Sequence, residues 1–433
     1  MRKNKNRQLN NDGAIAWDRL DNTANLFPVI ATESMTNVYR ISVTLNEDIV
    51  PEILQRAVED VLPFFDVFRY RLKKGIFWYY FEINKRPFPT VCVEDKTPCQ
   101  FIQPYANNEY LFRVSYYQKR INLEVFHVLT DGNGAFTFLK EITYQYLRYR
   151  HPELSGKVKN KLSQNTSLDI EDSYIKNYKH KAKKTYKTEK AVIVKGTHFE
   201  TGKFGIMHGY INLQDIKRVA KEYGVTLNQY LIGVYTWSIY KSYLNGSPCK
   251  NPISTCVPVN LRPYFQSDTT KNFFVIVSAV FKPQKDNYSF EEVLALIKES
   301  LDSQINKDNL EKLFSYNVSN EKNLILRAVP LWVKNIAMKG VYIKSARANT
   351  STVTNLGIVK VDDEYKEYIH RFHVALSMSV GQNIKGAVCS YDDTMVFTFS
   401  AAIKETMVQK CFFRKLSEDG IDVTVETNGV YYE

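Results

Sequence analysis

The chain has 433 residues, a formal net charge of +12, 44% hydrophobic residues and 13% aromatic residues. The abundant aromatic residues argue against a disordered chain, and the length favours two or more compact lobes over a single domain. No run of 18 apolar residues could span a bilayer, and the N-terminal segment lacks the apolar core of a signal peptide. We therefore expect a cytoplasmic protein with no membrane span.

Much of the positive charge falls in one lysine-rich stretch, from Lys157 to Lys190. Blocks of like charge repel one another and stay extended, so we interpret residues 156–195 as a solvated connector. A nucleic-acid binder would need base-stacking or groove-reading elements beside these lysines, and none is evident. We expect no nucleic-acid partner. The six cysteines contain no Cys-x-x-Cys pair, which favours free thiols over a metal site.

The first 155 residues mix strands and helices, and we predict an N-terminal lobe over residues 1–155. Alternating and helical spacings of apolar residues define its elements. In chain order they are a strand at 38–45, a helix at 53–62, two strands at 67–72 and 76–81 joined as a hairpin, a strand at 122–126 and a helix at 135–149.

Regular patterns resume after the connector, and we predict a C-terminal lobe over residues 196–433. The expected strands are 208–213, 253–259, 274–281, 352–359, 371–377, 387–391 and 395–400. Two helices should follow the first of these strands, and further helices are expected at 290–301, 331–343 and 405–416. Neither lobe shows regular strand–helix alternation, so α+β lobes around mixed sheets fit better than one doubly wound sheet.

The segment richest in chemistry is His127-Val128-Leu129-Thr130-Asp131-Gly132. Alternation before it places His127 at the end of a strand, and turn residues followed by a helix would hold the imidazole rigidly at the rim of a sheet. Imidazole accepts and returns protons near neutral pH, as a general base must. Inside the turn, Asp131 is better placed to cap backbone N–H groups or bind a buried arginine than to activate a substrate. We expect Gly132 and Gly134 to leave room for the substrate.

Other interpretations of the same residues are weaker. A lone histidine at a strand end is more often a hydrogen-bonded core residue, but the spacing to Asp131 and Gly132 favours a catalytic role. A dinucleotide-binding fingerprint would need glycine where Thr137 stands. His370 and His373 have the spacing of a metal pair, yet residues three apart in a strand face opposite sides. We therefore expect one buried and one exposed histidine, and no metal site.

With these residues the sequence resembles the chloramphenicol acetyltransferase and condensation-domain superfamily, whose signature is His-x-x-x-Asp-Gly. Residues 257–265 with 272–274, and residues 354–357, are similar to its bacterial alcohol acetyltransferase-like branch. With the order of elements, the resemblance covers nearly the whole chain. The Asp-Phe-Gly-Trp-Gly segment of the plant acyltransferases is absent.

The resemblance implies two similar lobes, each a mixed open β-sheet packed with helices, with an active-site tunnel between them. It further implies that His127 is the general base for transfer of an acyl group, expected to be acetyl, from acyl-CoA to a hydroxyl or amine. Acyl-CoA would be a co-substrate, with no tightly bound cofactor.

Four further residues gain candidate roles from the resemblance. Arg262 is the candidate partner of a structural Asp131, although a surface arginine in a turn is an equal alternative. Asn260 and Asn272 would order the tunnel or donate to the oxyanion, or serve as turn residues. Asn355 would lie where one lobe crosses to the other, or simply end a strand.

Three alternative functions stay open at this point. The first is a stand-alone condensation-type or wax-ester-type enzyme that uses carrier-bound or long-chain thioesters. The second is a non-catalytic binding protein on the same scaffold, against which the intact histidine, aspartate and glycine argue. The third is the nucleic-acid binder already weighed above. The sequence predicts neither the acceptor nor the oligomeric state.

Overall fold

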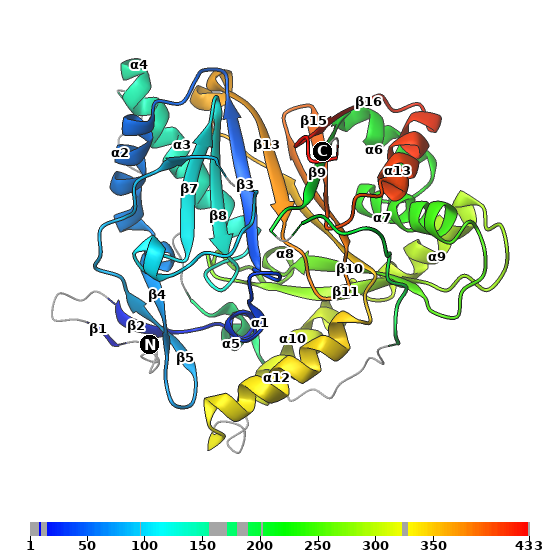
Figure 1. Cartoon of the computed structure of the whole chain (residues 1–433), viewed down its shortest axis with the longest axis horizontal. Helices are drawn as coiled ribbons and strands as arrows, with labels where there is room; N and C mark the ends of the chain where they lie inside the picture. Colours follow the sequence, from blue (N-terminus) through cyan, green and yellow to red (C-terminus); the bar gives the residue numbers. More distant parts are fainter. Residues whose placement is uncertain are drawn as a thin grey trace.

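A computed structural model of the chain describes residues 8–9, 15–95, 97–155, 171–179, 189–200, 202–322 and 328–431. These residues form two α+β lobes side by side, each with a core of its own (Figure 1). The architecture confirms the predicted fold class. Most of the expected connector, residues 156–170 and 180–188, lies outside the described residues.

The first lobe is built on a five-stranded sheet of order β13-β3-β8-β7-β6. Its strands are β3 (Val38–Leu45), β6 (Cys92–Val93), β7 (Phe112–Tyr117), β8 (Arg120–Phe126) and β13 (Ile369–Leu376). Two helices, α2 (Pro51–Val61) and α3 (Gly132–Arg150), pack together against this sheet. The apolar side chains that alternate along β3 and β8 are buried beneath them, which fixes the register of the sheet.

A small second sheet of order β1-β2-β5-β4 extends the first lobe. Its strands are β1 (Gln8–Leu9), β2 (Ile15–Arg19), β4 (Tyr70–Lys74) and β5 (Tyr79–Ile83). The predicted hairpin is present, with Lys74 opposite Tyr79. However, residues 67–69 belong to a 3-10 turn, Asp66–Arg69, and not to the expected strand. Val67 and Phe68 are both buried. A strand would place these neighbouring side chains on opposite faces of the sheet, whereas a 3-10 turn allows both to face the core.

The second lobe contains a seven-stranded sheet of order β11-β10-β12-β14-β15-β9-β16. The strands are β9 (Gly205–Asn212), β10 (Ile253–Asn260), β11 (Phe274–Phe281), β12 (Ser351–Ile358), β14 (Ile384–Tyr391), β15 (Thr394–Ala401) and β16 (Val423–Thr427). The longer helices are α6 (Leu213–Glu222), α7 (Leu227–Ser238), α9 (Phe290–Asp302), α10 (Lys307–Lys322), α12 (Leu331–Ala346) and α13 (Met407–Glu418). Across the described residues of both lobes, the short helices are α1 (Phe27–Ile30), α4 (Pro152–Ser155), α5 (Ser173–Asn177) and α8 (Arg262–Phe265).

One strand of the C-terminal half crosses to the other lobe. β13 pairs with β3 in the five-stranded sheet, with Leu376 opposite Tyr39. The resemblance had suggested that Asn355 lies in the crossing strand, but β12 stays in the seven-stranded sheet, parallel to both β10 and β14. Residues predicted for the C-terminal lobe (196–433) therefore complete the sheet that carries His127.

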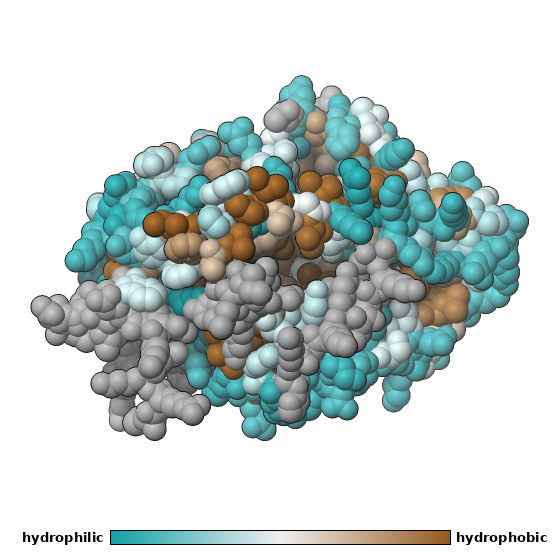
Figure 2. All heavy atoms as spheres, turned by 90° about the horizontal axis from the view of Figure 1, so that it is seen from below, coloured by the Kyte–Doolittle hydropathy of each residue, from teal (hydrophilic) through white to brown (hydrophobic). Residues whose placement is uncertain are grey.

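Apolar side chains gather on the underside of the molecule (Figure 2). Trp332, Ile336 and Val341 of α12 are each more than 60% exposed, and Ile76 of the β4–β5 hairpin is 76% exposed. Helix and hairpin are joined by a hydrogen bond from the backbone N–H of Leu331 to the carbonyl of Ile76, 2.8 Å long. In the described part of the chain, no helix has both the length and the apolar character needed to cross a bilayer.

Candidate active site

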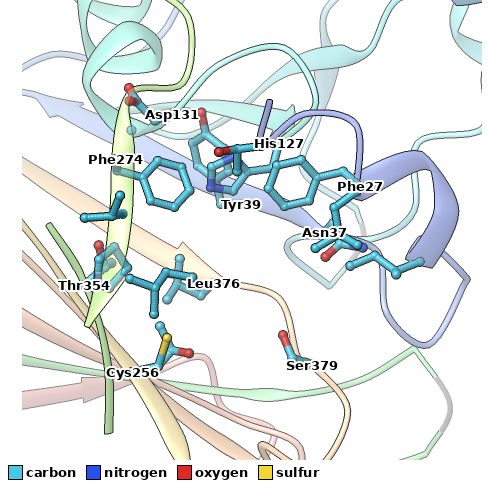
Figure 3. Close-up of a pocket in the computed structure, with 18 of the residues that line it drawn as sticks. Phe27, Asn37, Tyr39, His127, Asp131, Cys256, Phe274, Thr354, Leu376 and Ser379 are labelled. Atoms are coloured by element: carbon cyan, nitrogen blue, oxygen red, sulfur yellow. The ribbon is translucent and has the colours of Figure 1, made fainter. Parts of the chain in front are cut away.

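A cavity of about 1660 Å³ lies between the two lobes and is lined by residues of both. His127 and Tyr39 come from the first lobe, and Phe274, Cys256 and Lys385 come from the second. In Figure 3, His127, Phe27 and Tyr39 lie on one side of this pocket, and Cys256 and Ser379 lie across it.

Local structure places His127 at this position. β8 ends at Phe126, and the backbone N–H of His127 donates to the carbonyl of Asn37 at 2.9 Å. Helix α3 then begins at Gly132, with the Asp131 side chain accepting hydrogen bonds from the first backbone N–H groups of the helix. His127 is therefore held between the end of a strand and a capped helix, as the sequence predicted.

Three aromatic rings surround the imidazole of His127. The ring of Phe27 stacks on it with centroids 4.6 Å apart, and Tyr39 meets it edge-on at 4.9 Å. Phe274 lies at 5.7 Å from across the lobe boundary. The Tyr39 hydroxyl donates to the carbonyl of Thr130 at 3.0 Å, which fixes the tyrosine in turn. These contacts leave the imidazole little rotational freedom.

A chain of hydrogen bonds sets the tautomer of His127. The Asn272 amide nitrogen faces two acceptors, Asp21 Oδ2 at 2.9 Å and the His127 carbonyl at 3.3 Å. The Asn272 Oδ1 atom consequently faces His127 Nδ1, 3.1 Å away. An amide oxygen only accepts, so Nδ1 carries the proton and Nε2 keeps its lone pair. Nε2 is thus the basic atom.

Burial lowers the pKa of His127 below its ordinary value, while the Asp131 charge and the Asn272 hydrogen bond act in the opposite direction. The imidazole is therefore neutral at pH 7, the state in which it can accept a proton. Burial also raises the pKa of Asp21 to about 7, against the lowering effect of its Asn272 hydrogen bond.

Asp131 pairs with Arg262, the partner that the resemblance suggested. Arg262 Nη1 lies 2.8 Å from Asp131 Oδ2, and Nη2 lies 3.2 Å from Oδ1, a two-bond arrangement. The backbone N–H of Phe273 donates to the same carboxylate at 3.0 Å. In Figure 3 the Asp131 carboxylate points away from the His127 ring. Asp131 therefore ties the two lobes together beside the cavity.

The other predicted site residues make local contacts. Asn260 Oδ1 accepts from the backbone N–H of Arg262 at 3.1 Å, and Asn355 Oδ1 accepts from the backbone N–H of Gly357 at 2.9 Å. Gly357 has a φ of +74°, which favours glycine in that turn. Both asparagines line the cavity. Asn272 differs, because it contacts the imidazole directly and its amide donors are already engaged.

The two glycines after Asp131 lie where the lobes approach closely. A Cβ atom on Gly132 would lie 2.6 Å from Leu356 Cδ2 of the other lobe, and one on Gly134 would collide with the carbonyl oxygen of Thr270. Gly132 also lines the cavity, where we expected room for a substrate, whereas Gly134 is buried at the contact with Thr270.

The other histidines of the described chain do not line this cavity. His373 is 7% exposed and His370 is exposed, as expected for alternate faces of β13. The His373 ring lies 4.7 Å from that of His208 of the other lobe. Among the described residues, no three His, Cys, Asp or Glu side chains are grouped so that they could hold a metal ion.

Sequence patterns did not reveal the residues that surround His127. Asp21 and Phe27 lie about a hundred positions before it, and Phe274 lies well after it. Tyr39 lies in a predicted strand, where the alternating pattern identifies a core residue but does not show which side chains it contacts. Only the pairing of β3 with β8, and the contact between the lobes, bring these side chains together.

No family model and no curated protein matches the chain in sequence. Solved structures do match it. Polyketide synthase associated protein 5 from Mycobacterium tuberculosis is 14% identical with a TM-score of 0.61, over 92% of this chain and 96% of that one. TRI3 trichothecene 15-O-acetyltransferase from Fusarium sporotrichioides is 11% identical with a TM-score of 0.60, over 96% of each chain.

A third similar structure is a mutant of the starter condensation domain of rhizomide synthetase RzmA, in complex with C8-CoA and Leu-SNAC. It is 12% identical with a TM-score of 0.59, over 94% of this chain and 98% of that one. At such identities the likeness concerns the fold. The chain has the two-lobed fold of these acetyltransferase and condensation-domain structures, which agrees with the fold that the sequence resemblance implied.

Proposed function

We propose that this protein is an acyltransferase that moves an acyl group from a coenzyme A thioester to a hydroxyl or amine, with His127 as general base. The observation that carries this proposal is the state of His127: a neutral imidazole, fixed by Asn272, beside a large cavity between the lobes. A base with these properties suits proton removal from a weakly acidic nucleophile.

The reaction would proceed by direct transfer. His127 Nε2 accepts the proton of the acceptor O–H or N–H while the oxygen or nitrogen attacks the thioester carbonyl. The tetrahedral intermediate then collapses, the carbon–sulfur bond breaks, and the imidazolium returns the proton to the departing thiolate. The products are an ester or amide and free coenzyme A, and no resident cofactor takes part.

Coenzyme A is proposed as the carrier because of the similar structures. One is described as an acetyltransferase and another was solved with C8-CoA. The likeness to condensation domains keeps carrier-bound thioesters as an alternative donor. Asp131 and Arg262 would serve to hold the loop of His127, and Asn272 to orient its ring.

The apolar lining of one part of the cavity favours a second form of this function, transfer of a longer acyl chain than acetyl. Apolar residues of α12, among them Ala337, Met338 and Val341, line it and continue into the exposed apolar surface. A medium or long chain would cover them.

The proposal is tested by incubating the purified protein with acetyl-, octanoyl- or palmitoyl-CoA and a panel of alcohols and amines. Free thiol is followed with a chromogenic disulfide, and products are identified by mass spectrometry. We expect thiol release that depends on an acceptor and yields the acylated acceptor. Thiol release without any acylated product, or no release with any donor, would count against an acyltransferase.

A further inference from the structure

Lys385, on strand β14, places a buried ammonium group at the wall of the cavity. Lys385 is only 7% exposed, and it lines the cavity. The Nζ atom donates to the carbonyl of Ser377 at 2.7 Å and to Ser379 Oγ at 2.6 Å. An ammonium has three N–H donors, so these two contacts leave one for another partner.

Comparison with the other buried lysines shows what is missing at Lys385. Among the described residues three lysines are buried, and the other two have carboxylates: Lys271 pairs with Asp18 at 2.6 Å, and Lys415 pairs with Asp419 at 2.5 Å. For Lys385, no Asp or Glu of the described chain lies within ion-pair distance. Burying an ammonium group without a counter-ion costs free energy, because the dipoles of neutral groups replace only part of its hydration.

The groups around Lys385 do not neutralise its charge. Burial lowers the pKa of Lys385 to about 8, so the side chain is mostly protonated at pH 7. The charged groups that would favour its protonated form are the thiols of Cys256 and Cys99, but burial raises the pKa of both thiols, that of Cys256 to about 11. Both thiols therefore stay neutral. The positive charge faces the cavity uncompensated until a ligand supplies an anion.

His127 and Lys385 line the same cavity, so one ligand that fills it can contact both side chains. The charge of Lys385 is also a minor contributor to the lowered pKa of His127. The neighbours of Lys385, Cys256 and Ser379, lie across the pocket from the imidazole in Figure 3. Uncharged polar residues, Thr352 and Gln382, line the same region. A bound molecule could therefore place a reacting hydroxyl or amine at His127 and an anionic group at Lys385.

We propose that Lys385 binds a carboxylate of the acceptor substrate, so that the acceptor is a hydroxy acid or an amino acid derivative and not a neutral alcohol. This inference rests on the proposed function. A carboxylate suits the site because one ammonium with one spare donor matches a single negative charge. A phosphate of coenzyme A is the other source of an anion, and it is distinguished by experiment.

The test measures ligand binding and does not depend on turnover. The affinities of octanoate and 1-octanol, which differ in their polar end, are compared by calorimetry for the wild type and for Lys385→Met. We expect the wild type to bind octanoate at least about tenfold more tightly, since hydrogen bonds between charged partners are stronger than those between neutral groups. The preference should vanish in Lys385→Met and persist in part in Lys385→Arg.

Lys415→Met is the matched control, because Lys415 is equally buried but paired with Asp419. It should keep the preference for octanoate, and thermal melting verifies that each variant folds. Equal wild-type affinities for the two ligands, or a preference retained in Lys385→Met, would overturn the inference. So would weaker binding of desulfo-CoA to Lys385→Met with the octanoate preference intact, which would assign Lys385 to the donor.

These outcomes are separable from failure of the proposed function. If the protein transfers no acyl group but prefers octanoate through Lys385, the anion site stands and the acyltransferase assignment fails. If acyl transfer occurs equally well to neutral and carboxylate-bearing acceptors in both wild type and Lys385→Met, the acyltransferase assignment stands and the anion site fails.

Discussion

His127 and His373 belong to the same five-stranded sheet, yet their surroundings differ. His127 follows β8, and His373 lies in β13, with β3 between the two strands. Burial lowers the pKa of both imidazoles. His127 lines the cavity and has its tautomer fixed by Asn272. His373 packs against His208, and its Nδ1 atom is buried without a hydrogen bond.

Burial and a shifted pKa therefore do not by themselves identify a catalytic base. Both histidines have these properties. What separates them is access to a cavity large enough for a substrate, together with a hydrogen-bond partner that leaves Nε2 basic. Variants that remove one of these features at a time test whether it distinguishes His127 from His373.

The largest expected effect on stability concerns the ion pair that holds the His127 loop. In Arg262→Met, Asp131 keeps its backbone N–H partners but loses its counter-ion, and both side chains are about 9% exposed. We expect unfolding to become easier by about 3 kcal/mol, since breaking a buried pair leaves a charge uncompensated.

Denaturant unfolding measures this effect, with Arg218→Met as the control. Arg218 pairs with Glu222 on the exposed face of α6, and exposed pairs contribute less than about 1 kcal/mol. If the two variants lose equal stability, the Asp131–Arg262 pair does not have the structural role assigned to it.

A smaller effect is expected from Asn272→Leu, which removes the group that fixes the His127 tautomer. A net hydrogen bond of about 1 kcal/mol corresponds to a loss of about five- to tenfold in kcat. KM for the donor should change little, because Asn272 is 1% exposed and lies behind the imidazole. An unchanged kcat, measured from initial rates of thiol release, would show that Asn272 does not orient the base.

Replacing the other histidine should matter still less. In His373→Phe the hydrogen bond with the Tyr210 hydroxyl, 3.1 Å long, is lost, but the unpartnered Nδ1 atom is removed as well. We expect kcat/KM within about threefold of wild type, because the change leaves the cavity wall near His127 intact. A hundredfold loss would mean that His373 takes part in the reaction.

The smallest expected effect is on the pH dependence of the wild type. If His127 is the base, activity requires its neutral form and is lost as pH falls through its pKa, which burial lowers from the ordinary 6.5. The acid limb of kcat/KM should therefore have its midpoint below pH 6.5. A midpoint above pH 6.5, in initial rates corrected for donor hydrolysis, would contradict a neutral, buried base.

Local patterns were sufficient to predict most elements of the fold. The strands at 38–45 and 274–281 have the bounds that alternation indicated, and His127 stands at the strand end where we placed it. Helix α10 and strand β16 were not predicted, and the 3-10 turn at 66–69 was mistaken for part of a strand. Short apolar runs do not distinguish these conformations.

The candidate site was harder to predict because it depends on contacts between distant segments. Asp21 and Asn272 are 251 positions apart, and both lie far from His127 in sequence. The close approach of Leu356 to Gly132 and of Thr270 to Gly134 was not predicted, because contacts from the other lobe leave no local signal in the sequence. The motif therefore located the proposed base but not the residues that contact it.

The proposed role of His127 as the base for acyl transfer is tested by comparing kcat/KM of His127→Ala with that of His373→Ala. General base catalysis is typically worth about a hundred- to ten-thousandfold. We expect a loss in that range for His127→Ala with an unchanged melting curve, and less than about tenfold for His373→Ala. Near wild-type kcat/KM in folded His127→Ala would contradict the account.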